Sequence, residues 1–104
     1  MVEDRIFKAL ADPSRRAIFE SLTRGEAAVK DLTARFDISQ PAVSQHLATL
    51  KGAGLVRARR EGRCVHYRVD SRGMKPLIDW IAHYRAFWTD RADRLERLLE
   101  TMDR

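Results

Sequence analysis

The apolar residues of this chain change their spacing at Gly54, and this change limits the folds that the chain can adopt. Before Gly54, apolar residues recur three and four positions apart, as in helices; after it, they alternate with polar residues, as in strands. The alternating residues form two short runs, with Glu61-Gly62 between them as a two-residue hairpin turn. The sequence therefore predicts a hairpin over about residues 55–69, with helices before it and a long helix over about residues 72–102 after it.

The part of the chain before the hairpin is predicted to contain four helices. Apolar residues at helical spacing indicate a first helix over roughly residues 3–11. The second helix has Asp12 as its N-cap, Pro13 in its first turn and Gly25 as its stop. We therefore expect a mainly α-helical fold with a β-hairpin, built as one domain of residues 1–104 with a modest core.

The charge balance narrows the partners that this chain can have. Lys and Arg number 20 against 15 acidic residues, which gives a net charge of +5. Small basic proteins most often bind nucleic acid, an anionic membrane or no particular partner. No apolar run reaches the ~20 residues of a membrane span, and the N-terminus lacks a signal-peptide apolar region. The lone Cys64 excludes an intrachain disulfide and a multi-thiolate metal site within one chain. A cytoplasmic protein without a membrane partner is therefore expected.

The third and fourth helices are the first feature with a functional meaning. The third lies within "VKDLTARFDI", the fourth is capped by Ser39, and the tight turn between them indicates a helix-turn-helix over about residues 30–53. A buried stripe on the fourth helix leaves small and hydrogen-bonding residues on the opposite face, among them Pro41 and Gln45. Such a face can approach base edges in the DNA major groove, although a solvated amphipathic helix has the same pattern. Ser39 and Gln40 stand at the helix N-terminus, where free N–H groups suit a phosphate.

The predicted hairpin is strongly basic around its turn. Arg57, Arg59, Arg60 and Arg63 cluster there, directly after the predicted helix-turn-helix. A hairpin in this position is a wing, and basic wing tips reach the backbone of flanking DNA. An edge strand protected from aggregation by its charge is the alternative reading. Because the hairpin follows a helix that fits the groove, we favour phosphate contacts by Arg59, Arg60 and Arg63.

Three segments of the chain together resemble a known family. They are "LADPSRRAIFESL", "ISQPAVSQHLATLKGAGLVRARREGR" and "VHYRV", which closely resemble the ArsR (arsenical-resistance repressor) family of bacterial winged-helix transcription regulators. The resemblance implies a homodimer that binds a palindromic operator and represses, often at its own promoter. It also implies that five residues lie at the DNA surface, namely Ser39, Gln40, Ser44, Gln45 and His46. Because His46 flanks the buried stripe, a hydrogen bond at the edge of the core is an open alternative for it.

The chain departs from the metal-sensing members that it resembles. Where they have a Glu-Leu-Cys-Val-Cys-Asp-Leu segment, this chain has "EAAVKDL", so that Ala28 and Lys30 replace both thiolate ligands. A second ligand set on the last helix falls on Ile81, Ala92 and Leu95, and His83 is roughly 200° away from that register. We therefore predict a metal-independent regulator without a cofactor. A metal site at Asp79 and His83, or a redox switch at Cys64, are the alternatives that these residues leave open.

The last helix carries apolar residues at alternating spacings of three and four, a coiled-coil seam with one polar break at Arg91. A core-facing stripe accounts for the beginning of this helix, but residues 88–102 overhang the domain. The aromatic residues near its middle could also line an apolar ligand pocket. Pairing with the same helix of a second subunit is the better account. The predicted dimer interface comprises Ile6, Leu77, Ile81, Tyr84, Trp88, Leu95, Leu98 and Met102.

These observations favour a dimeric winged helix-turn-helix repressor whose partners are double-stranded operator DNA, a second copy of itself and an effector yet to be identified. An enzyme is disfavoured, because no nucleophile, base and orienting acid cluster in the motifs and no glycine-rich phosphate loop is present. Two alternatives remain. One is a winged-helix protein-interaction module whose basic wing binds an acidic partner. The other is a metal or thiol sensor with a non-standard site.

Overall fold

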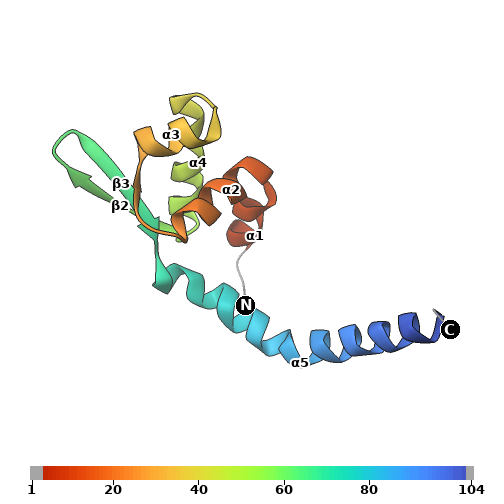
Figure 1. The fold of residues 1–104 in the computed structure, drawn as a ribbon. Coiled ribbons are helices and arrows are strands. Elements are labelled where there is room, and N and C mark those ends of the chain that lie inside the picture. The colour runs from red at the N-terminus through yellow and green to blue at the C-terminus, as the bar shows by residue number, and fades with distance from the viewer. Residues whose placement is uncertain (1–3, 103–104) are drawn as a thin grey trace.

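The computed structural model describes residues 4–102, which form five helices and a three-stranded sheet (Figure 1). The first four helices gather into one group, the hairpin projects from this group, and the last helix leaves it as a long arm (Figure 1). The fold is therefore mainly helical with a β-hairpin, as predicted. The elements in chain order are α1 (Asp4–Ala11), α2 (Pro13–Leu22), β1 (Ala27–Ala28), α3 (Val29–Phe36), α4 (Gln40–Gly52), β2 (Val56–Glu61), β3 (Cys64–Val69) and α5 (Ser71–Met102).

Two of the predicted helix starts are confirmed by their caps. The Asp12 carboxylate accepts a 2.9 Å hydrogen bond from the backbone N–H of Arg15, and this bond lowers the pKa of Asp12 below its ordinary value. The Ser39 hydroxyl accepts a 3.2 Å bond from the backbone N–H of Ala42. Helix α2 ends at Leu22, earlier than the predicted stop at Gly25. The predicted start of the first helix at residue 3 lies outside the described residues.

The carbonyl groups at the end of α1 are satisfied by two arginines of α2. Arg15 donates from Nη1 to the carbonyls of Lys8 and Ala9, at 3.2 and 3.4 Å. Arg16 donates from its own Nη1 to the carbonyl of Leu10 at 3.0 Å. The last carbonyls of a helix have no partner within the helix, and a cation there also complements the helix dipole. The "DPSRR" segment therefore starts one helix and ends the preceding one.

The sheet has the strand order β1-β3-β2, with both pairs antiparallel. Glu61 pairs with Cys64, so the hairpin turn consists of Gly62 and Arg63. The predicted Glu61-Gly62 turn is therefore wrong by one residue, and Gly62, with φ of +60°, takes the left-handed conformation that such turns require. The sequence did not predict β1, which pairs through only two residues with β3.

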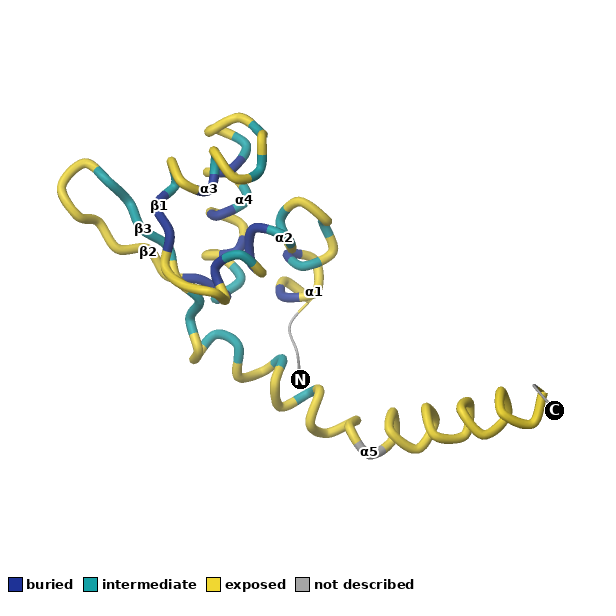
Figure 2. The backbone as a smooth tube through the Cα atoms, in the orientation of Figure 1, coloured by how far each residue is buried: buried dark blue, intermediate teal, exposed yellow. Residues whose placement is uncertain are grey.

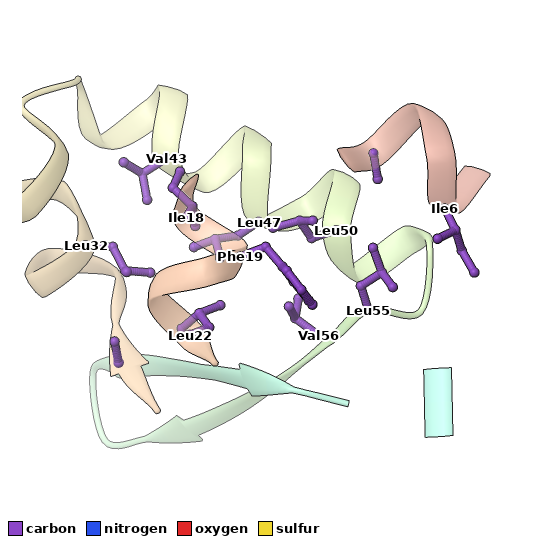
Figure 3. Packing of buried hydrophobic residues seen from close by; sticks show 12 residues of the cluster. Ile6, Ile18, Phe19, Leu22, Leu32, Val43, Leu47, Leu50, Leu55 and Val56 are labelled. Carbon is purple, nitrogen blue, oxygen red and sulfur yellow. The ribbon is translucent and has the colours of Figure 1, made fainter. Parts of the chain in front are cut away.

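The core lies between the four helices α1–α4 and the base of the hairpin (Figure 3). The predicted stripe of α4 is confirmed, because Val43, Leu47 and Leu50 are all fully buried. Ile6, which we predicted at a dimer interface, is only 3% exposed and packs into this core. That expectation needs correcting, because a side chain enclosed by its own chain has almost no surface for a second copy. Phe7 is the large exposed apolar residue of α1 and packs edge-on against Trp80, with 5.4 Å between the ring centroids.

Helix α5 starts directly beside the end of α4. The backbone N–H of Asp70 donates to the carbonyl of Leu55 at 2.9 Å, and the Asp70 carboxylate accepts from the backbone N–H of Arg72 at 3.0 Å. Gly73 lies so close to Gly54 that a Cβ at position 73 would meet the Gly54 carbonyl. The first turn of α5 is therefore fixed against the turn that joins α4 to β2. Within residues 4–102, no helix is both long and apolar enough to cross a membrane.

Candidate nucleic-acid interface

Helix α4 presents a small, hydrogen-bonding face to solvent. Opposite the buried stripe, the exposed residues of this helix include Pro41, Ser44, Gln45, Ala48 and Thr49. The Thr49 hydroxyl is turned back onto the helix, where it donates to the Gln45 carbonyl at 3.1 Å. The Gln45 amide stands near the middle of this face, without a bulky charged neighbour that would keep DNA bases at a distance.

A cleft lies between the N-terminal end of α4 and the hairpin. Its volume is about 290 Å³, and its polar lining comes from Lys30, Gln40, Ser44, Arg63 and Cys64. Two cations, Lys30 and Arg63, and Gln40 at the start of α4 therefore line one hollow, a combination that suits an anion such as a DNA phosphate. The sequence analysis missed Lys30 as part of this group. The structure brings Lys30 there because α3 begins beside the central strand β3.

His46 lies at the edge of the core and not on the exposed face of α4. Its side chain is half-buried, and its Nδ1 atom is buried with no hydrogen-bond partner within residues 4–102. The carboxylate of Asp12, at the start of α2, is close enough to interact with it electrostatically. His46 therefore faces the α2 side of the domain, away from the surface that Gln45 occupies.

The arginines of the hairpin differ in what they contact. Of Arg59, Arg60 and Arg63, only Arg59 has an ion pair within residues 4–102. Its guanidinium binds both carboxylate oxygens of Glu26, at 3.1 and 3.0 Å, and one oxygen of Glu61 at 3.1 Å. Arg60 and Arg63 are exposed at the tip of the hairpin. Near the turn, the positive charge that the wing offers to a partner therefore lies on Arg60 and Arg63, while Arg57 and Arg68 are exposed nearer the base of the hairpin.

A broad stripe of apolar residues runs along α5. Figure 2 shows that most of this helix is exposed. Its beginning packs on the core through Met74, Leu77 and Trp80. A groove of about 700 Å³ lies along this part of the helix beside Trp80 and Tyr84. Beyond it, the predicted seam residues are between 38% and 71% exposed, and these are Ile81, Tyr84, Trp88, Leu95, Leu98 and Met102.

The positions at which metal sensors carry ligands are occupied here by other groups. Ala28 is buried in β1, and Lys30 is exposed at the start of α3. Asp79 forms an ion pair with Lys75 at 3.1 Å, and the His83 ring packs edge-on against Tyr84 at 4.8 Å between centroids. Among the residues that the structure describes, no group of three or more His, Cys, Asp or Glu side chains could hold a metal ion.

A helix-turn-helix of α3 and α4 that is followed by a β-hairpin defines the winged helix-turn-helix class. Residues 12–58 match a protein family described as "Bacterial regulatory protein, arsR family". The transcriptional repressor SdpR of Bacillus subtilis is 32% identical over 81 residues, which cover 78% of this chain and 90% of SdpR. An HTH-type transcriptional regulator of Mycobacterium tuberculosis is 44% identical over 86 residues, covering 83% of this chain and 78% of that protein.

A solved structure supports the same assignment. The crystal structure of a possible transcriptional regulator for arsenical resistance superposes with a TM-score of 0.71 at 42% sequence identity, covering 90% of this chain and 94% of that one. The chain therefore belongs to the arsR family of bacterial regulatory proteins, a family of transcription regulators that bind DNA.

Proposed function

We propose that this chain is an autoregulatory transcriptional repressor that binds a palindromic operator as a homodimer. The observation that carries the proposal is the exposed face of α4, which is small and hydrogen-bonding and lies beside the basic tip of the wing. A face of this kind suits base edges, whereas arginines suit the phosphates that flank them. The repressing activity is proposed from the likeness to SdpR, whose name describes a transcriptional repressor.

The proposed DNA contacts follow from these positions. Gln45 and Ser44 would contact bases, with Pro41 beside them on the same face of α4. Gln40, at the start of the helix, would contact a phosphate. Ser39 would act there chiefly as the cap, since its hydroxyl oxygen already accepts a bond from Ala42. His46 faces the α2 side of the domain, so we do not propose that it contacts bases.

The proposed homodimer is supported by the apolar stripe on α5. The stripe packs on the chain's own core where α5 begins, and it continues without cover to Met102. A contiguous exposed apolar surface on a protein of this size is typical of a protein–protein interface. A second copy of α5 carries the same stripe, so that two copies related by a two-fold axis would cover each other's stripe. The whole chain then acts as one domain that both binds DNA and dimerises.

The base-reading role of Gln45 is tested by Gln45→Ala. The operator is first located by footprinting the DNA upstream of the chain's own gene. We expect this variant to lose about 1–3 kcal/mol of binding free energy on the operator and little on scrambled duplex, because only base contacts carry sequence information. Thr49→Ala is the matched control, since the Thr49 hydroxyl is engaged by its own helix. An equal loss of affinity on both DNAs would contradict a base-reading helix.

We further propose that the regulator does not respond to metals or arsenicals. The support is chemical, because Ala28 and Lys30 provide no soft donor and a cation at position 30 repels another cation. Operator affinity should therefore be the same with zinc, with arsenite and with a chelator. A titration of fluorescent operator DNA measures this. A tenfold change in affinity, equivalent to ~1.4 kcal/mol, with any of the three additives would rule out the metal-independent assignment.

A further inference from the structure

We propose that Glu26 and Arg59 form a clamp that fixes the hairpin to the helical domain, and that Arg59 positions the wing without contacting DNA phosphate. The clamp is the ion pair between these two side chains. Its effect on DNA rests on the proposed DNA-binding function, but the clamp itself is a contact within one chain and can be measured without DNA.

The geometry of the clamp is that of a strong, directional ion pair. Nε and Nη2 of Arg59 donate to the two carboxylate oxygens of Glu26 at 3.1 and 3.0 Å, in the parallel arrangement that binds guanidinium to carboxylate. Nη1 of the same side chain donates to Glu61 at 3.1 Å. The hydrogen bonds from Arg59 lower the pKa of Glu26, so the carboxylate stays ionised at neutral pH.

The clamp crosses the middle of the sheet. Arg59 on β2 pairs with His66 on β3, and His66 pairs in turn with Ala28 on β1. Glu26 lies two residues before Ala28, on the far side of the central strand from Arg59. The outer part of β2 is exposed from its second residue onward, and a two-stranded hairpin alone is only marginally stable in water. The clamp therefore joins this outer strand to the segment that precedes β1.

The charge of the clamp makes Arg59 a poor phosphate ligand. One guanidinium lies between two carboxylates, so Glu26, Arg59 and Glu61 together carry a net charge of −1. A phosphate approaching Arg59 would be repelled by both carboxylates. Alternation along β2 places Arg60 on the opposite face of the sheet from Arg59. Phosphate contacts of the wing thus fall to Arg60 and to Arg63 in the turn.

Hydrogen exchange of the free protein tests the clamp directly. Glu26→Gln should raise the exchange rates of the β2 and β3 amides about threefold to fivefold, the size expected for losing a partly exposed ion pair of good geometry. Arg60→Gln is the matched control, and it should leave these rates unchanged. Unchanged hairpin exchange in Glu26→Gln, while its overall stability is unaffected, would overturn the clamp.

A salt titration of DNA binding separates positioning from phosphate contact. Arg60→Gln should reduce the slope of log affinity against log salt by about 0.9 for each subunit, because one phosphate contact is lost. Arg59→Gln should lower operator affinity and leave that slope unchanged. If Arg59→Gln reduces the slope as much as Arg60→Gln does, Arg59 contacts phosphate and the positioning role is wrong. If neither variant changes the slope, the proposed phosphate contacts of the wing fail, while the exchange experiment still decides on the clamp.

A charge swap completes the test. Arg59→Glu breaks the clamp and places three carboxylates together, so it should weaken operator binding by about tenfold. The double variant Glu26→Arg with Arg59→Glu again has one guanidinium and two carboxylates in the cluster. We expect it to recover most of the lost affinity. A double variant that binds no better than Arg59→Glu would mean that position 59 requires a cation for DNA itself.

Discussion

Gly73→Ala is expected to destabilise the fold and to displace the start of α5. A Cβ at position 73 would overlap the carbonyl oxygen and carbonyl carbon of Gly54. These are backbone atoms, and Gly54 already has a φ of +80° that L-residues rarely adopt. Overpacking of this kind costs about 3 kcal/mol or more when the backbone has to move. Thermal unfolding should show a loss of about 10–20 °C in Tm.

Gly52→Ala is the matched control for this substitution. A Cβ at Gly52, the last residue of α4, would meet no atom within 4 Å. Alanine is also favoured over glycine in a helix by about 0.5–1 kcal/mol, so the Tm should stay unchanged or rise slightly. Equal destabilisation by the two substitutions would contradict a tight contact between Gly54 and Gly73.

The close approach of these two glycines has a consequence for DNA binding. Gly54 follows α4 by two residues, and Gly73 lies in the first turn of α5. The helix that we propose to read bases and the helix that we propose to dimerise are therefore linked by a close backbone contact between these two glycines. In the proposed homodimer, the distance between the two α4 helices would then depend on how the two α5 helices pair, and this distance would have to match the spacing of two half-sites.

Much of the fold could be predicted because its signals are local. Asp12 and Ser39 cap helices within three residues of themselves, and the change of spacing at Gly54 marks the passage from helix to strand. The exposed face of α4 could be predicted in the same way, because the residues opposite a buried stripe of a helix must face solvent. Local patterns of this kind need no knowledge of distant contacts.

The features that could not be predicted depend on distant partners. Ala27 and Ala28 form a strand too short to have a period, and they are a strand only because β3 lies beside them. Arg59 looked like its basic neighbours, but its partner Glu26 is 33 residues away in the chain. The hairpin turn was misplaced by one residue because Gly62 fits a two-residue turn in either register, and the pairing of the strands decided between them.

The central claim, that a homodimer binds the operator through two α4 helices, depends on the stripe of α5. Leu95 and Leu98 are each 56% exposed and lie in the part of the stripe that the core does not cover. In a dimer both side chains would be buried at the interface, and an ionised carboxylate is strongly disfavoured at a buried position. Leu95→Asp with Leu98→Asp should therefore prevent dimerisation. Since one half-site alone binds weakly, operator affinity should fall by about a hundredfold or more.

The decisive measurement is analytical ultracentrifugation of the chain and of this double variant, together with operator binding by each. Arg97→Asp is the control, because it changes the net charge by the same amount at an exposed polar position of the same helix. We predict that the unchanged chain and Arg97→Asp sediment as dimers that bind the operator, and that the double variant sediments as a monomer that does not. A double variant that remains dimeric and binds the operator, or an unchanged chain that is monomeric while bound, would contradict this account.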